Sequence, residues 1–237
     1  MKAATLARLV AARAARWPVA LVTLLESGAQ SLIGAAGETQ GAPLPDDLAT
    51  AAREALAEDS SRTVETAEGR AFIHVHAPPH RLIVVGAVHV TQPLVRIAAL
   101  AGYDVSVIDP RAAFASDARF PEVSVIGEWP DEALARLAPD ARTAVVTLTH
   151  DPKLDDPALI VALVSPAFYV GALGSRRTHA KRCLRLTEAG LDAASLARLH
   201  APIGLAIGAV SPAEIAIAVM AEITAVRRLG DTRRAAA

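Results

Sequence analysis

The chain has a single cysteine, Cys183, and aromatic side chains make up only 3% of its 237 residues. One cysteine cannot form an intramolecular disulfide or a multi-cysteine metal site, and it fits a reducing compartment. No segment approaches the ~18 uninterrupted apolar residues of a membrane-spanning helix, and no apolar run followed by a small-residue cleavage site opens the sequence. We therefore expect a cytoplasmic protein without a membrane segment.

An excess of charge of either sign is also missing. The chain has 24 basic and 25 acidic residues and a net charge of −1, so we expect no nucleic-acid partner. Hydrophobic residues make up 52% of the chain. With so few aromatics, the core must be built from alanine, valine, leucine and isoleucine, which suits helices packed closely on a parallel sheet. Composition therefore indicates an α/β protein.

The clearest pattern lies between Arg81 and Arg111. A short apolar run over 81–85 is typical of a buried parallel strand and ends at Gly86. Apolar residues then recur at helical spacing over 94–101, and β character resumes over 105–108. This segment is predicted to be a βαβ unit.

The rest of the chain divides around the two prolines at Pro78 and Pro79, where the pattern changes. Residues 1–77 predict a small α+β domain, with helices at 3–16 and 46–58, a strand at 19–25, a loop-like segment at 27–40, and a hairpin of 62–66 and 70–76 turning at Glu68-Gly69. Residues 78–230 predict a Rossmann-like domain with a mostly parallel sheet. Its later elements are strands at 123–126, 143–149 and 168–173, helices at 131–137, 158–164 and 175–189, a loop or short strand at 203–209, and a last helix from Ser211 to about Arg228 that opens with a capping box. Residues 231–237 are expected to fray.

The turn after the first strand of the βαβ unit contains Gly86, Ala87 and His89. It lies where a dinucleotide-binding fingerprint would, but valine and threonine stand at Val88 and Thr91 in place of the second and third glycines. A β-branched residue suits neither a positive φ nor close backbone contact with phosphate, so ordinary NAD binding is disfavoured. The turn could bind an anion at the following helix N-terminus or serve the fold alone.

Other candidate binding residues follow the later strands. Asp109 lies 23 residues after Gly86, where it could bind a ribose or begin a turn, and Arg111 could pair with it or reach a phosphate. His150 and Asp151 follow the next predicted strand, whose carboxyl end should face the same crevice. The remaining candidates are the oxyanion-binding segment Gly174, Ser175, Arg176 and Arg177 and the glycine loop with Gly204 and Gly208.

Catalytic and metal-binding patterns are weak. Cys183 falls within a helix with no base close in sequence, which indicates a buried small apolar residue. His74 and His76 could share one strand face, but two imidazoles alone are weak support for a metal. We predict no catalytic residues and no metal site.

Together these motifs resemble a known family. The segments PPHRLIVVGAVHV, VSVIDPR, RFP, VVTLTHD, YVGALGSRR and PIGLAIGAVSPAEIAIAVMAEITAVR, in this order between about Pro78 and Arg228, are similar to the XdhC/CoxI family of molybdenum-cofactor insertion chaperones. The chain departs from the family pattern at Val88 and Thr91, at Pro152 in place of a second histidine, at Ala206 in place of an aspartate, and in lacking a cysteine around 27–40. It thus resembles a divergent member.

The resemblance implies a Rossmann domain that binds the molybdenum cofactor (molybdopterin) and delivers it to a molybdenum hydroxylase apoenzyme of the xanthine dehydrogenase or CO dehydrogenase type. A cysteine desulfurase is a further implied partner, and the apolar last helix could form a homodimer face or pack in the core. The cofactor phosphate would lie near Ser175–Arg177 or the Gly86 turn, with the pterin between His89 and His150. Alternatives are an NAD(P)-dependent oxidoreductase in the same crevice and a scaffold that has lost its ligand.

Overall fold

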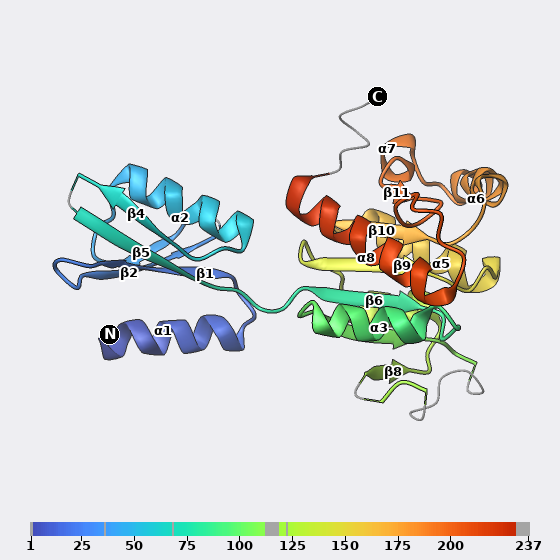
Figure 1. Cartoon of the computed structure of the whole chain (residues 1–237), viewed down its shortest axis with the longest axis horizontal. Helices are drawn as coiled ribbons and strands as arrows, with labels where there is room; N and C mark the ends of the chain where they lie inside the picture. Colours follow the sequence, from blue (N-terminus) through green and yellow to red (C-terminus); the bar gives the residue numbers. More distant parts are fainter. Residues whose placement is uncertain (1, 36, 68, 112–118, 122, 231–237) are drawn as a thin grey trace. The chain divides into compact units, whose positions relative to one another are not determined.

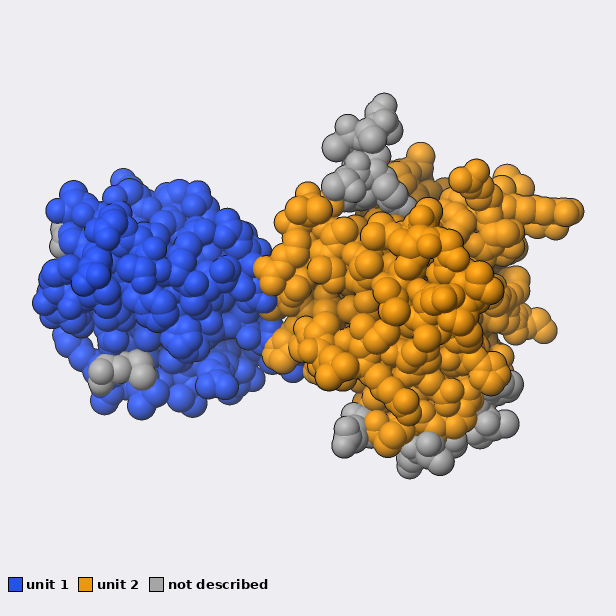
Figure 2. All heavy atoms as spheres, in the orientation of Figure 1, with its two compact units in different colours: residues 1–78 blue, residues 79–237 orange. Residues whose placement is uncertain are grey.

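The computed structural model describes residues 2–35, 37–67, 69–111, 119–121 and 123–230. The expectations for Glu68 and for the tail 231–237 lie outside these residues. The chain divides into two compact units, residues 1–78 and 79–237, coloured separately in Figure 2. Each unit is described by itself.

The first unit contains an antiparallel sheet with strand order β3-β2-β1-β5-β4. Its elements are α1 (Ala3–Ala14), β1 (Val19–Leu24), β2 (Gln30–Gly34), β3 (Thr39–Gly41), α2 (Asp46–Glu58), β4 (Arg62–Thr66) and β5 (Gly69–His76). The helices cover opposite faces of this sheet (Figure 1), because side chains alternate along β1: Leu21 packs with Leu9 of α1, whereas Val22 packs with Leu48 of α2.

The prediction of a loop over 27–40 was wrong, because this segment contains β2 and part of β3. Leu32 and Ile33 lie on opposite faces of the sheet and are buried by α1 and α2 respectively. Strand β2 pairs with β1 from Val19–Gly34 to Thr23–Gln30. The glycines of the segment fall at Gly28, Gly34 and Gly37, in or next to the turns, so they frame a strand instead of preventing one.

The second unit is a parallel sheet with strand order β11-β10-β9-β6-β7-β8, as the described residues show. Its elements are β6 (Arg81–Val85), α3 (Thr91–Leu100), β7 (Asp104–Ile108), β8 (Ser124–Ile126), α4 (Pro130–Leu137), β9 (Thr143–Thr147), α5 (Pro152–Val164), β10 (Tyr169–Ala172), α6 (Arg176–Glu188), α7 (Ala193–Leu196), β11 (Leu199–His200) and α8 (Pro212–Leu229). The predicted α/β class, with a Rossmann-type parallel sheet, is confirmed.

Three boundaries in this unit differ from the predictions. Strand β9 ends at Thr147 instead of residue 149, and α5 begins at Pro152 instead of residue 158, because the Asp151 side chain accepts a hydrogen bond from the Lys153 amide and caps the helix early. Helix α5 thus includes Pro157. The segment 203–209 is a loop, and the edge strand lies earlier, at β11.

Helices cover both faces of the parallel sheet. Helices α3 and α8 pack on one face with the cluster around Leu94 and Val219, and α4, α5 and α6 pack on the other with the cluster around Leu134, Leu159 and Leu186. Val219 and Ile223 of α8 are fully buried, whereas Ile217 is exposed, so the apolar side of this helix packs mainly in the core. Among the described residues, no helix is both long and apolar enough to cross a membrane.

Strand order reverses between β6 and β9. From β6 the chain builds outward through β7 and β8, and it then returns to β9 on the other side of β6. Ligands of open α/β sheets bind at the carboxyl ends of the strands near such a switch point.

Candidate functional site

The turn after β6 is held by its own side chains. Gly86 has a φ of +110°, and the buried Thr91 donates its hydroxyl to the Gly86 carbonyl over 2.5 Å. The Ala87 amide donates to Asp109 Oδ2 over 2.8 Å. The turn therefore keeps its shape without the second and third glycines of a dinucleotide-binding fingerprint.

The substitutions Val88 and Thr91 do not strain this turn. Within it only Gly86 has a positive φ, so the steric cost expected of valine at position 88 does not arise. Thr91 replaces the packing role of the third glycine with a hydrogen bond. A dinucleotide is thus disfavoured by the engagement of the backbone amides and not by side-chain bulk.

Asp109 is fully buried and binds Arg111. Arg111 donates from Nε to Oδ1 over 2.9 Å and from Nη2 to Oδ2 over 2.8 Å, and its amide donates to Oδ1. Burial alone would raise the pKa of Asp109, but the hydrogen bonds from Arg111 and Ala87 outweigh it and hold this pKa below its ordinary value. Of the two interpretations of Asp109, the turn is the one these contacts satisfy, since both carboxylate oxygens are engaged.

His150 and Asp151 separate in role. His150 is exposed and has a φ of +62°, a left-handed conformation that is uncommon for a residue with a side chain. It lies on the wall of a pocket, whereas Asp151 caps α5.

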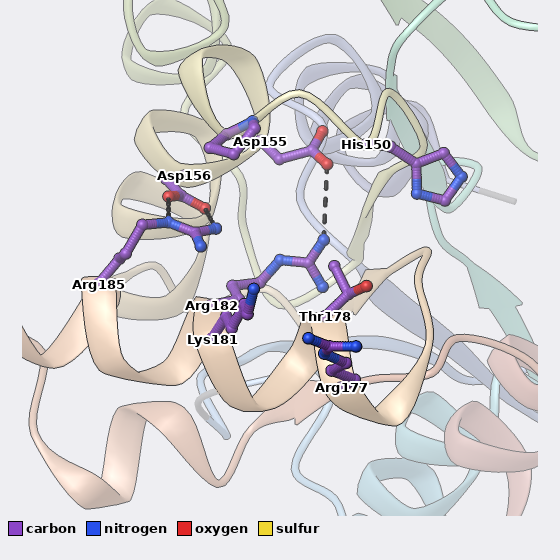
Figure 3. A pocket seen from close by; sticks show the side chains of 9 residues that line it. His150, Asp155, Asp156, Arg177, Thr178, Lys181, Arg182 and Arg185 are labelled. Carbon is purple, nitrogen blue, oxygen red and sulfur yellow. Dashed lines mark hydrogen bonds and ion pairs between the residues drawn. The ribbon is translucent and has the colours of Figure 1, made fainter.

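That pocket lies between the first turns of α5 and the exposed side of α6 (Figure 3). Its volume is about 320 Å³, and it is lined by His150, Pro152, Asp155, Asp156, Arg177, Thr178, Lys181, Arg182 and Arg185. We call it the α5–α6 pocket. Four of these side chains are cationic and two are carboxylates, so the lining carries a net charge of +2 with histidine neutral, from 4 − 2.

One carboxylate is fully paired with a cation. Arg185 donates to both oxygens of Asp156, with a distance of 3.0 Å from Nη2 to Oδ1. The hydrogen bond with Asp156 raises the pKa of Arg185. This fork fixes the ends of both side chains along one edge of the pocket (Figure 3).

The other carboxylate belongs to a buried and incomplete pair. Asp155 accepts from Thr149 Oγ1 over 2.7 Å, but its Oδ2 lies 3.6 Å from Arg182 Nη2, too far for a hydrogen bond. Arg182 is 2% exposed and donates to the Leu173 carbonyl, while its Nε and Nη1 have no hydrogen-bond partner among the described residues. Burial raises the pKa of Asp155 and lowers the pKa of Arg182.

Arg177 and Lys181 remain as exposed cations without a hydrogen-bond or ion-pair partner within the described residues. Both lie on α6, which Ser175 caps through the Thr178 amide over 3.1 Å. The first helical amides, of Arg176 and Arg177, have no acceptor inside a helix. Positive side chains at a helix N-terminus oppose the dipole unless an anion compensates them.

The structure brings together only some of the predicted site residues. His150 and Arg177 line the α5–α6 pocket, and Gly174, Ser175 and Arg176 lie at the adjoining start of α6. A separate group at the β6 turn contains Gly86, Ala87, Asp109 and Arg111, while His89 is exposed beside it.

The glycine loop plays a packing role at one of its two glycines. A Cβ at Gly204 would come within 3.1 Å of the Ala218 backbone of α8, and the Gly204 amide donates to Glu222 over 2.7 Å. A Cβ at Gly208 would meet nothing within 4 Å. The loop contributes no lining residue to the α5–α6 pocket.

Most cations and carboxylates of the pocket were not predicted. Asp155, Asp156, Lys181, Arg182 and Arg185 lie inside helices, where charged residues usually face solvent. One signal was present: Arg177, Lys181 and Arg185 recur every four residues, which places three cations on one helix face.

The interpretation of Cys183 as a buried apolar residue was wrong. Its side chain is half-buried, and Sγ lies 3.6 Å from Nε2 of His179 one helical turn earlier. In the first unit, His74 and His76 do share a face, with ring centroids 4.0 Å apart. The described residues contain no group of three histidine, cysteine or acidic side chains that could hold a metal ion.

Comparison with known proteins identifies the second unit. A family model described as the XdhC Rossmann domain matches residues 82–223, which include the α5–α6 pocket and the β6 turn. The chain belongs to this family. The resemblance predicted from the sequence motifs is confirmed.

Three curated relatives match about two thirds of the chain. The uncharacterized protein YqeB of Escherichia coli K12 is 36% identical over 156 residues, covering 66% of this chain and 29% of that protein. A probable subunit of xanthine dehydrogenase from Bacillus subtilis 168 is 34% identical and covers 66% and 46%. The molybdenum cofactor insertion chaperone PaoD of E. coli K12 is 32% identical and covers 63% and 41%. The chain spans less than half the length of these relatives.

The fold has a counterpart among solved structures. A crystal structure described as a xanthine dehydrogenase from Bacillus halodurans superposes with a TM-score of 0.70 and 24% identity, over 95% of this chain and 64% of that chain. At this identity the likeness concerns the fold.

Proposed function

We propose that this protein is a non-catalytic maturation chaperone that binds the molybdenum cofactor and delivers it to a molybdenum hydroxylase apoenzyme of the xanthine dehydrogenase or CO dehydrogenase type. Family membership supports this proposal, as do the names of two relatives, a molybdenum cofactor insertion chaperone and a probable subunit of xanthine dehydrogenase. A cysteine desulfurase partner, a homodimer and a cytoplasmic location remain predictions.

The observation that carries the proposal is the surplus of positive charge in the α5–α6 pocket. Asp155 and Asp156 are engaged by Arg182 and Arg185, which leaves the charges of Arg177 and Lys181 for a ligand. Molybdopterin ends in a phosphate, and such a group suits two cations beside unpaired helix amides. The pocket opens at the carboxyl side of β9 and β10, where an α/β sheet places its ligands.

In this proposal the side chains bind and orient their cargo without breaking bonds. Arg177 and Lys181 hold the phosphate, and His150, whose backbone conformation is uncommon, contacts the remainder of the molecule from the opposite wall. A carrier must also release its cargo, and exposed cations allow release because their attraction for an anion is screened by water and salt.

The NAD(P)-dependent oxidoreductase is the second candidate for the same crevice. The amide of Ala87 and the carboxylate of Asp109 would have to receive the dinucleotide, yet they are bonded to one another, and Arg111 engages the carboxylate as well. A dinucleotide would break these contacts before making its own. This cost favours the chaperone, and a ligand-free scaffold is the third candidate.

The test is anaerobic cofactor capture by the full chain. The protein is mixed with freshly released molybdenum cofactor, free cofactor is removed by gel filtration, and the protein peak is assayed for oxidised pterin fluorescence and molybdenum. Near-stoichiometric pterin is the expected result. A folded protein peak without pterin would contradict the proposal, and a titration with nicotinamide cofactors would then separate the oxidoreductase from the scaffold.

A further inference from the structure

We propose that the α5–α6 pocket is a binding site for a tetrahedral oxyanion of the phosphate class, held by Arg177, Lys181 and the first amides of α6, with Arg182 in the wall behind them. The identity of this oxyanion with the phosphate of the molybdenum cofactor rests on the proposed function. The anion site itself does not.

Unpaired positive charge gathers on one face of α6. Arg177 and Lys181 lie one helical turn apart, so they face the same side of the helix and both line the pocket. Each repels the other, and both oppose the positive end of the helix dipole. An anion between them removes both unfavourable interactions, and no carboxylate of the pocket is free to do so because Asp155 and Asp156 are engaged.

The buried guanidinium of Arg182 adds to this charge. Its Nε and Nη1 have no partner among the described residues, and Nη1 lies 3.8 Å from the place where a Cβ on Gly174 would be. The charge of Arg182 is therefore directed at the loop that opens α6. Its ion pair with Asp155 is 3.6 Å long and leaves much of that charge uncompensated in a region of low dielectric constant.

The start of α6 differs from the start of α3 in its unused amides. The first amide of the β6 turn is consumed by Asp109, and Thr91 satisfies the Gly86 carbonyl. At α6 the N-cap uses only the Thr178 amide. The anion site of this Rossmann-type domain is thus displaced from the first βα turn to the turn between β10 and α6.

The direct test is an amide chemical-shift titration of the full chain with inorganic phosphate, run against chloride at matched ionic strength. We expect saturable, phosphate-dependent shifts at Ser175–Thr178 and little change at Ala87 and Val88. Shifts confined to the β6 turn, or equal shifts with chloride, would overturn the proposal.

Variants then assign the charges. Arg177→Ala with Lys181→Ala removes two exposed cations and should weaken phosphate binding at least tenfold. The matched control, Arg96→Ala with Lys153→Ala, removes one arginine and one lysine from exposed positions of the same unit that do not line the pocket, and should change affinity less than twofold. Equal losses in both variants would mean that only net charge matters, against a built site.

Arg182 needs a variant that keeps the fold. Arg182→Gln alone would leave Asp155 buried without its cation, so it is combined with Asp155→Asn, which neutralises both partners at nearly constant volume. A loss of phosphate affinity in this double variant, with an unchanged amide spectrum elsewhere, supports the role of the buried charge. Wild-type affinity would remove Arg182 from the site.

Cofactor capture by the same variants separates this inference from the proposed function. If the wild-type protein binds cofactor and Arg177→Ala, Lys181→Ala binds it equally well, the chaperone stands and the phosphate assignment fails. If phosphate binds at α6 but the wild-type protein captures no cofactor, the oxyanion site stands and the proposed function fails.

Discussion

Thr149 lies so close to Gly86 that a Cβ on the glycine would come within 2.6 Å of the threonine Cγ2 methyl. The two residues belong to the loops after β6 and β9, the neighbouring strands at which the sheet reverses its order. The contact joins the two halves of the Rossmann-type unit at the edge where ligands of such sheets bind.

Gly86→Ala is therefore expected to destabilise the second unit by about 2–4 kcal/mol, because the new methyl adds a clash to a φ of +110°. The free energy of unfolding can be measured by urea denaturation followed by fluorescence in a Trp17→Phe background. The other tryptophan, Trp129, lies in the second unit and then reports on that unit alone.

Gly102→Ala provides the control for this prediction. Gly102 also has a positive φ, +81°, but a Cβ there would meet nothing within 4 Å. This variant should show only the backbone cost of about 1 kcal/mol. If Gly86→Ala is no worse than Gly102→Ala, the contact with Thr149 does not constrain the turn.

The buried pair of Asp109 and Arg111 predicts a loss of stability in acid. The pKa of Asp109 is lower in the folded protein than in the unfolded chain, so the unfolded chain binds more protons as the pH falls through this window. The stabilisation is complete above about pH 4, the ordinary carboxyl range, and is lost as the pH falls through the lower pKa of the folded state.

Asp109→Asn should consequently lower stability near pH 7 and flatten the dependence of the unfolding free energy on pH below about pH 4. The same tryptophan-based titration, repeated from pH 7 to acid, measures both effects. Asp131→Asn, at a half-exposed position in the first turn of α4, controls for the removal of one carboxylate. Parallel acid profiles for wild type and Asp109→Asn would show that Asp109 does not contribute.

Local patterns predicted the fold where neighbouring residues decide the structure. The βαβ unit from Arg81 to Ile108 and helix α2 were predicted from periodicity, because burial on one helix face or both strand faces leaves its mark on adjacent positions. Strand β2 was missed, since its formation depends on pairing with β1 and on burial between two helices. Helix α5 began early because the Asp151 cap outweighed Pro157 as a boundary signal.

The site was predictable in location but not in composition. The sequence indicated the loops after β9 and β10 because Rossmann-type sheets bind ligands there, and His150 and Arg177 do line the pocket. Arg182 and Asp155 could not be found in this way, because their meeting depends on how α5 packs against α6. A buried ion pair between two helices leaves no local pattern in either helix.

The capping box at the start of α8 predicts a measurable helix-end contribution. The Ser211 hydroxyl accepts from the Glu214 amide over 3.3 Å, and Glu214 accepts in return from the Ser211 amide over 2.8 Å. Ser211→Ala should lower the unfolding free energy by about 1 kcal/mol, whereas Ser211→Gly should cost only a few tenths. If alanine and glycine are equivalent at this position, the serine side chain is not the cap that stabilises α8.

Glu222 holds the loop before α8 from inside the core, because it accepts hydrogen bonds from the Tyr169 hydroxyl over 2.6 Å and from the Gly204 amide over 2.7 Å. Burial alone would raise the pKa of Glu222, but its hydrogen bonds with His200, Tyr169 and Gly204 hold the pKa below its ordinary value. Glu222→Gln keeps the shape but turns one acceptor into a donor, so we expect a loss of about 2–3 kcal/mol at pH 7 in urea unfolding. The exposed Glu132→Gln should be nearly neutral. Equal stability of the two variants would mean that the buried carboxylate is not what fixes the loop, and that the packing of Gly204 on α8 holds it instead.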